Sequence, residues 1–399
     1  MHPPGARTVL VRYGEVGIKS DSLRTRMERQ LQTNISAILD DRELPGSVEQ
    51  AYTRLYVHTT PDRIDEVTDA TTDAFGVVSA SPALRVEPTM DAICDALADA
   101  TRDHYDGSTF AVRVNRAGPS SAHPFSSLEL ERDGGSVVHT AAQEEGYEPT
   151  VDLDDPEMTF SVECRQEDAY VFLDRREGPG GLPIGTQKPL VALVSGGIDS
   201  PVAAWLAMKR GAPVYPLYVD LGEYGGVDNR MRAIETAESL KRYAPNVDCR
   251  LRIAPGGEGI EQVAGVTEMY RMLVARRFML RIAASLAEAV GAVGVVTGES
   301  IGQKSSQTAT NLRVTSTAVD LPVHRPLLSM DKSEITDRAK QIGSYDDSTI
   351  DAGCQQLAPD APATRPPLER IDAAEPDELA ALAADAAEAI TVVDADPSA

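Results

Sequence analysis

The chain has 399 residues, of which 42% are hydrophobic, and its formal net charge is −24. That length allows two or three domains, each with a core of its own. The sequence has no apolar run long enough to cross a bilayer and its first residues lack the apolar segment of a signal peptide, so we expect a soluble, cytoplasmic protein with no membrane partner.

The acidic balance bears on whether the protein binds nucleic acid. Contacts to phosphates supply most of the affinity for RNA, and a net charge of −24 opposes such contacts. We interpret the composition as an adaptation to high intracellular salt. Such salt limits the repulsion between charges to distances of a few Å. Under this hypothesis of a halophilic protein, the net charge does not exclude an RNA partner.

The first element in chain order is a strand followed by a basic helix. TVLVRY at residues 8–13 has the pattern of a strand. A helix follows to residue 39, with apolar residues at helical spacing: Leu23, Met27, Leu31, Ile35 and Ile38. We assign residues 1–60 to a small N-terminal domain, although a strand with a solvated basic helix would give the same pattern.

Residues 61–177 form the second predicted domain and mix helix with strand signals, as in α+β domains. Helical spacing or strand alternation occurs in turn at residues 64–77, 90–101, 109–115, 158–165 and 170–175. Residues 178–189, GPGGLPIGTQKP, hold glycine and proline at a density that interrupts helices and strands. We therefore place a linker there.

The most specific motif follows this linker. Residues 190–194 are typical of a parallel strand buried on both faces, and SGGIDS at 195–200 follows directly. The two glycines allow positive φ and close approach to a ligand, and Ser200 with Pro201 is typical of a helix start, with a hydroxyl suited to capping. Free N–H groups at a helix N-terminus bind anions, so the turn predicts a pyrophosphate site. A bare glycine pair would also fit an ordinary strand-to-helix turn.

Beyond the motif, strand and helix signals alternate to residue 370. They occur at residues 214–219, 229–244, 247–253, 269–289, 293–297 and 332–342. This alternation predicts right-handed βαβ crossovers and an α/β fold with a doubly wound parallel sheet. The tail, residues 371–399, is rich in Ala, Asp and Glu, and we expect one weak helix plus disordered residues.

Two segments of this half carry candidate ligand contacts. In the predicted helix 269–289, Arg276 and Arg277 interrupt an apolar stripe that we expect to be core: Met272, Met279, Ile282 and Leu286. Solvated or salt-bridged arginines are the ordinary alternative. The second segment is TGESIGQKSSQTATNL, in which Gly298 allows close approach of a ligand and Gln307 can form hydrogen bonds with a nucleotide.

The four cysteines are far apart in the sequence: Cys94, Cys164, Cys249 and Cys354. No two of them form a C-x-x-C pair, which argues against a zinc site and a disulfide framework. We expect the first three to be buried packing residues. Cys354 follows Gly353 and precedes two glutamines, a context that predicts exposure.

Several ordered motifs between residues 8 and 358 resemble one family. SGGIDS resembles the pyrophosphate loop of the ATP pyrophosphatases. The further motifs RYGEVGIKS, FAVRVNRAG, TGESIGQKSSQTATNL, HRPLLSMDKSEITDRAKQIGSY and STIDAGCQQLAP resemble the tRNA 4-thiouridine synthetases (tRNA uracil 4-sulfurtransferases). The resemblance implies a ferredoxin-like domain at 1–60, a THUMP RNA-binding domain at 61–177 and an ATP-pyrophosphatase (PP-loop) domain at 190–370.

This resemblance also implies site residues, cofactors and partners. ATP would be bound by Leu193, Val194, Ser195, Gly196, Gly197, Asp199, Ser200, Tyr218, Val219, Arg276, Gly298 and Gln307. Asp199 would orient Mg²⁺ or the phosphates, and Cys354 would carry the sulfur as a thiolate or persulfide. The enzyme would adenylate O4 of a tRNA uridine, at position 8 in the family, and replace it with sulfur. Arg113, Asn115 and Arg116 could contact RNA phosphates.

The chain departs from well-known family members in two respects. It lacks a carboxy-terminal rhodanese domain, and it lacks the C-x-x-C pair of some archaeal members, so the sulfur donor, a persulfide carrier or sulfide, stays open. A second role in sulfur supply for the thiamine thiazole, and assembly as a homodimer, also stay open. The alternatives are another ATP pyrophosphatase, such as a 2-thiouridylase, and a non-catalytic tRNA-binding protein.

Overall fold

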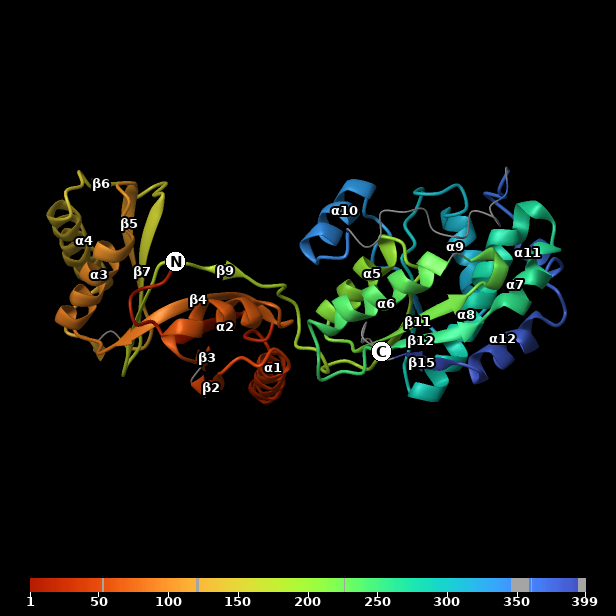
Figure 1. The fold of residues 1–399 in the computed structure, drawn as a ribbon, viewed down its shortest axis with the longest axis horizontal. Coiled ribbons are helices and arrows are strands. Elements are labelled where there is room, and N and C mark those ends of the chain that lie inside the picture. Colours follow the sequence, from red (N-terminus) through yellow and green to blue (C-terminus); the bar gives the residue numbers. More distant parts are fainter. Residues whose placement is uncertain (52–53, 120–121, 226, 346–358, 360, 394–399) are drawn as a thin grey trace. The chain divides into compact units, whose positions relative to one another are not determined.

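The computed structural model describes residues 1–399 except 52–53, 120–121, 226, 346–358, 360 and 394–399. The chain divides into two compact units, residues 1–181 and 182–399, both drawn in Figure 1. Within the described residues, no helix is both long and apolar enough to span a membrane.

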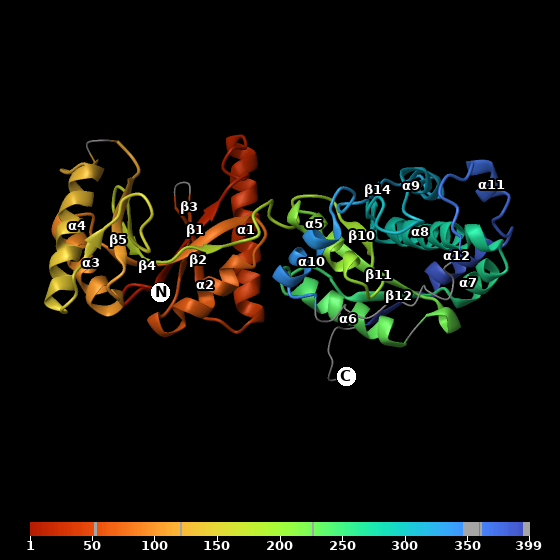
Figure 2. The ribbon, with the colours of Figure 1, turned by 90° about the horizontal axis from the view of Figure 1, so that it is seen from above.

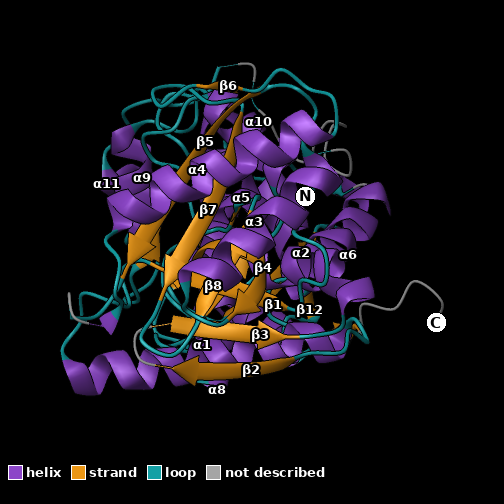
Figure 3. Cartoon of the chain, turned by 90° about the vertical axis from the view of Figure 1, so that its left-hand side faces the viewer, coloured by secondary structure: helices purple, strands orange, loops and turns teal. Residues whose placement is uncertain are grey.

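The first unit is built on one nine-stranded sheet. Its strands are β1 (Thr8–Tyr13), β2 (Ser47–Ala51), β3 (Arg54–His58), β4 (Val77–Val86), β5 (Thr109–Arg116), β6 (Thr150–Val151), β7 (Met158–Cys164), β8 (Ala169–Phe172) and β9 (Arg176–Glu177). They are ordered β2-β3-β1-β4-β8-β7-β5-β6, with β9 paired to β4. The antiparallel pair of β2 and β3 is seen side by side in Figure 3. The long strand β4 pairs with β1 through its first half and with β8 through its second half, so one sheet runs through both predicted N-terminal domains.

Helices cover this sheet in two pairs. They are α1 (Asp21–Asp41), α2 (Ile64–Thr72), α3 (Met90–His104) and α4 (Ser127–Glu144). The predicted face of α1 is confirmed, because Met27, Leu31, Ile35 and Ile38 are buried, and Leu23 is half-buried. The helix predicted at 64–77 ends early, because Gly76 has a φ of 105° and strand β4 starts directly after it.

The second unit has a six-stranded sheet. Its strands are β10 (Leu190–Leu193), β11 (Val214–Asp220), β12 (Leu251–Pro255), β13 (Val295–Val296), β14 (Val323–His324) and β15 (Thr391–Val393), in the order β14-β13-β10-β11-β12-β15. The first five are parallel, and β15 is antiparallel to β12. The predicted doubly wound parallel sheet is confirmed. Its strand order reverses between β10 and β13, and the SGGIDS turn follows β10.

Helices lie on both faces of this sheet. They are α5 (Asp199–Lys209), α6 (Val227–Lys241), α7 (Gly257–Ala264), α8 (Arg271–Val290), α9 (Ala309–Ser316), α10 (Lys332–Gln341), α11 (Leu368–Asp372) and α12 (Leu379–Glu388). One core cluster joins α6 to β11 and β12, and a larger one joins α7, α8 and α12 to the opposite side chains of the sheet. Figure 2 shows α6 and α8 on opposite sides of the strands.

The prediction for the tail is confirmed for its one helix, α12, and is wrong for residues 391–393, which form a strand in place of a disordered segment. Residues 368–393 form two helices and a strand, and β15 extends the sheet by pairing Thr391 with Ile253. Leu379, Ala383 and Ala386 are buried in the core cluster of α8. High acidic charge with few large apolar residues suggests disorder. Alanine favours helices, however, and small side chains at helical spacing allow α12 to pack closely against α8.

Candidate functional site

A pocket lies where the carboxyl ends of β10, β11 and β13 meet. This is the reversal of the strand order, the place where open parallel sheets bind ligands. The pocket brings together most of the predicted ATP contacts: Leu193, Val194, Ser195, Asp199, Ser200, Tyr218, Val219, Arg276, Gly298 and Gln307. Gly196 and Gly197 belong to the same turn without lining the pocket, and Cys354 lies outside the described residues.

The SGGIDS turn is held by its own polar atoms. The Ser195 N–H donates to Ser200 Oγ at 3.2 Å, and the Ser200 hydroxyl lies 3.3 Å from the carbonyl oxygen of Gly197, to which it donates. Helix α5 begins at Asp199, with Ile198 as its cap residue, so Ser200 lies inside the first turn. The prediction that Ser200 caps the helix is therefore wrong, because its hydroxyl turns back to close the loop.

Two glycines are required by close contacts. Gly196 has a φ of 70°, and a Cβ there would lie 2.9 Å from the Asn229 carbonyl oxygen. At Gly298 a Cβ would lie 2.9 Å from the Ser200 backbone nitrogen, so a glycine lets the end of β13 approach α5. The predicted positive φ is confirmed at Gly196 and is wrong at Gly197, which does not adopt one.

Asp199 presents its carboxylate to the pocket at the start of α5. Lys332 Nζ lies 3.1 Å from Oδ1, and Gln303 Nε2 lies 3.2 Å from each carboxylate oxygen. Mg²⁺ in nucleotide sites is usually held by one or two carboxylates and the substrate phosphates. A single carboxylate beside the SGGIDS turn fits that donor set, and the described residues contain no cluster of three or more His, Cys, Asp or Glu that could hold a metal alone.

Helix α8 contributes a cationic and apolar wall. Arg276 donates from Nη1 to the Ser306 carbonyl oxygen at 2.8 Å and from Nη2 to Ser306 Oγ at 3.1 Å. Met272 and Met279 line the pocket, are half-buried and pack against the core cluster of α8, so the expectation that they are core residues is confirmed only in part. The same expectation is confirmed for Ile282 and Leu286, which are buried.

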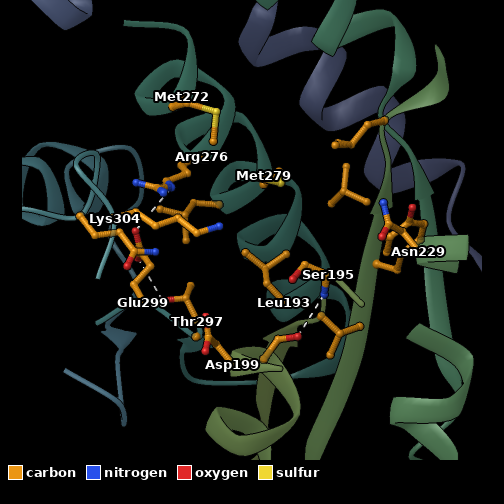
Figure 4. A pocket seen from close by; sticks show the side chains of 18 residues that line it. Leu193, Ser195, Asp199, Asn229, Met272, Arg276, Met279, Thr297, Glu299 and Lys304 are labelled. Carbon is orange, nitrogen blue, oxygen red and sulfur yellow. Dashed lines mark hydrogen bonds and ion pairs between the residues drawn. The ribbon is translucent and has the colours of Figure 1, made fainter. Parts of the chain in front are cut away.

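Several lining residues escaped the sequence reasoning. They are Leu221, Asn229, Met272, Met279, Leu280, Thr297, Glu299 and Lys304. In Figure 4, Glu299, Arg276 and Lys304 lie together on one side, and Asn229 lies on the other. Glu299 directly follows Gly298 in the sequence, and this position could have indicated a pocket residue. Asn229 comes from α6, and only the tertiary fold brings it to the turn.

The described cysteines do not resemble reactive thiols. Burial raises the pKa of Cys164 to about 11 and that of Cys249 to about 12, so both are neutral near pH 7. Both are buried, which confirms the prediction, whereas Cys94 is only partly buried.

The sheet of the first unit carries an arginine cluster, formed by Arg12, Arg54 and Arg165. Arg54 binds the buried Glu163 through two hydrogen bonds of 2.9 Å, and Arg12 lies 3.8 Å from the same carboxylate. Arg165 also donates to it. Burial lowers the pKa of Arg12 to about 10. Because one carboxylate faces three guanidinium groups, the cluster carries surplus positive charge.

Comparison with known proteins assigns the family. Residues 185–379 match the family Thiamine biosynthesis protein (ThiI), residues 8–81 match the ThiI ferredoxin-like domain, and residues 87–174 match the THUMP domain. A Probable tRNA sulfurtransferase of Halobacterium salinarum is 54% identical over 380 residues, which are 95% of each chain. The chain belongs to the ThiI family.

Other relatives agree with this assignment to the ThiI family. A Probable tRNA sulfurtransferase of Methanosarcina acetivorans is 40% identical over 89% of this chain and 85% of its own. The crystal structure of a 4-thiouridine synthetase in complex with RNA and bound ATP has a TM-score of 0.84 and 29% identity, covering 98% of this chain and 100% of that one. The fold of PH1313 from Pyrococcus horikoshii is also similar, with a TM-score of 0.65 at 24% identity, over 84% of this chain and 99% of its own. The interpretation of the acidic composition as salt adaptation fits a ThiI-family relative from Halobacterium.

Proposed function

We propose that the chain is a cytoplasmic, ATP-dependent tRNA sulfurtransferase that converts a tRNA uridine to 4-thiouridine. The observation that carries this proposal is the pocket that joins the SGGIDS turn, Arg276, Gly298 and Gln307 at the strand-order reversal. Relatives named tRNA sulfurtransferases and a similar structure with RNA and ATP support it. A different ATP pyrophosphatase would not need the arginine cluster of the first unit.

The pocket suits a nucleoside triphosphate. Backbone N–H groups of the turn and the N-terminus of α5 would bind the pyrophosphate part, and Tyr218 with Val219 would border the adenine. Arg276 would contact a phosphate through N–H groups not donated to Ser306. Asp199 would hold Mg²⁺, which neutralises polyphosphate charge when it is bound.

The reaction would have two steps. O4 of the uridine bonds to the α-phosphorus while the bond to pyrophosphate breaks, which activates C4 by adenylation. A sulfur nucleophile then bonds to C4, and the C4–O4 bond breaks as AMP leaves. Cys354 would carry that sulfur as a persulfide, by resemblance of its motif to the family's essential cysteine. Its terminal sulfur would bond to C4, and a second thiol, such as free cysteine, would then attack the Cys354 sulfur and break the S–S bond. That step leaves 4-thiouridine and a disulfide between Cys354 and the second thiol. The donor would be a persulfide carrier or sulfide.

The first unit would hold the tRNA. The positive charge of Arg12, Arg54 and Arg165 exceeds the negative charge of Glu163 between them, which suits contacts with phosphates. Arg113 and Asn115 are exposed on β5 and could contact phosphates as well.

The family description as a thiamine biosynthesis protein favours a second role, the supply of sulfur for the thiamine thiazole.

An assay with purified protein tests this function. The protein is incubated with unmodified tRNA, ATP, Mg²⁺ and a cysteine desulfurase charged with cysteine, and 4-thiouridine and pyrophosphate are measured. We expect both products from the wild type, pyrophosphate without 4-thiouridine from Cys354→Ser, and both from the matched control Cys94→Ser. Formation of neither product by the wild type would refute the function, and normal thiolation by Cys354→Ser would refute only the sulfur assignment.

A further inference from the structure

The pocket contains a buried carboxylate between two arginines. Glu299 Oε2 accepts hydrogen bonds from Arg325 Nε at 2.8 Å and from Thr297 Oγ1 at 3.0 Å. Its other oxygen, Oε1, is buried, accepts no hydrogen bond among the described residues, and lies 3.7 Å from Arg276 Nε. The side chain of Glu299 is only 10% exposed, so these charges interact with little screening by water.

Arg325 fixes Glu299 from outside the pocket. Its Nη1 donates to Ser316 Oγ at 3.0 Å, and its Nη2 lies 3.3 Å from Thr315 Oγ1, both in α9. The guanidinium group is therefore bound to α9 on one side and to the carboxylate on the other. Because Glu299 is held by Arg325 and Thr297, its free oxygen has a defined place in the wall of the pocket.

The orientation of the Arg276 guanidinium group depends on contacts with Ser306 and with Glu299. A guanidinium group has five N–H donors in one plane. Two of them go to Ser306, and the Nε–H side faces Glu299 Oε1. These contacts on two sides fix the plane of the group and leave the remaining Nη–H donors for a ligand. Figure 4 shows Arg276 and Glu299 together on one wall of the pocket.

We propose that Glu299 is a positioning residue that holds Arg276 in the orientation in which its remaining N–H groups face the bound triphosphate. This inference rests on the proposed function, because it takes ATP as the ligand of the pocket. The orienting role and a direct repulsion of ATP predict opposite effects on ATP affinity when the carboxylate is removed. A carboxylate that acted only on the triphosphate would repel it, so its removal would strengthen ATP binding.

Binding of ATP to the full chain, measured by calorimetry, tests this positioning role in a double-mutant cycle. We expect Glu299→Gln to weaken ATP binding roughly tenfold, because the amide keeps the shape and loses the charge that orients Arg276. In an Arg276→Gln background, the same substitution should have almost no further effect. Unchanged or tighter binding by Glu299→Gln, or equal losses in both backgrounds, would overturn the proposal.

A matched control separates positioning from general stability. Glu375 is also paired with arginines of α8, namely Arg277 and Arg281, and it lies away from the pocket. Glu375→Gln should lower the melting temperature while the affinity for ATP stays unchanged. An equal loss of ATP affinity in Glu375→Gln would assign the effect of Glu299 to the stability of α8 and contradict the positioning role.

A milder variant covers the case in which Glu299→Gln does not fold. Thr297→Val keeps the volume and removes only the hydroxyl that holds Oε2. We expect a loss of ATP affinity of a few-fold that disappears in the Arg276→Gln background. No loss in Thr297→Val would overturn the inference. Failure of the wild type to bind ATP would instead refute the proposed function, so the two failures are distinguishable.

Discussion

Arg276 and Arg277 are consecutive residues of α8 whose guanidinium groups serve different parts of the fold. Arg276 lines the pocket and donates to Ser306. Arg277 is buried and is paired with Asp372 and Glu375 of the carboxy-terminal segment. Successive residues on a helix point about 100° apart, so α8 connects the pocket to that segment through neighbouring side chains.

The first prediction separates these two arginines. We expect Arg276→Gln to weaken ATP binding and leave stability nearly unchanged. Arg277→Gln should lower the free energy of unfolding by about 3 kcal/mol, because it removes a buried guanidinium group that is paired with Glu375 and donates to the Val314 carbonyl oxygen. Urea unfolding and nucleotide titration of both variants check this. Equal effects on stability would contradict the division of roles.

The second prediction concerns the carboxy-terminal segment. Leu379→Ala should destabilise the protein by about 3 kcal/mol, because Leu379 is buried in the core cluster of α8. Val392→Ala is the matched control, since Val392 is 47% exposed on β15, and it should cost less than about 0.5 kcal/mol. The midpoints of urea unfolding measure both. A disordered segment would make the two substitutions equally harmless.

The third prediction concerns the turn. Gly196→Ala should abolish ATP binding, because its φ is 70° and its Cβ would lie 2.9 Å from the Asn229 carbonyl oxygen. Gly302 has a φ of 80° in open surroundings, so Gly302→Ala carries the backbone strain without the clash. We expect Gly302→Ala to lower stability by about 1 kcal/mol and still bind ATP. If both variants bound ATP equally well, the close contact at Gly196 would not matter.

The sequence could predict only those parts of the site that are formed by residues near one another in the chain. The strand, glycine turn and helix at residues 190–205 follow one another in sequence, so their order and their ligand class were readable. The backward hydrogen bond of Ser200 and the approach of Asn229 depend on tertiary packing, which no local pattern reports. The pairing of β15 with β12 was hidden for the same reason, because its partner lies far away in sequence.

The fourth prediction is a pH dependence. Burial raises the pKa of Cys249 to about 12, above the value of about 8.5 for an exposed thiol. Above pH 9 the unfolded chain loses this proton while the folded chain keeps it, so the free energy of unfolding falls as pH rises. Cys249→Ala should show a shallower fall between pH 9 and 11 in urea unfolding. Identical slopes for the two proteins would contradict the raised pKa.

The fifth prediction concerns salt. With a net charge of −24, repulsion within the folded chain should weaken as salt screens it, so stability should rise with KCl concentration. Thermal unfolding across a KCl series checks this. Equal stability in dilute buffer and in molar KCl would refute the interpretation of the composition as salt adaptation.

The most direct test of the central claim is the 4-thiouridine content of tRNA from cells that lack the gene. We expect that digested tRNA from the deletion strain contains no 4-thiouridine, that the wild-type gene restores it, and that Asp199→Ala does not. Undiminished 4-thiouridine in the deletion strain would contradict the proposed function.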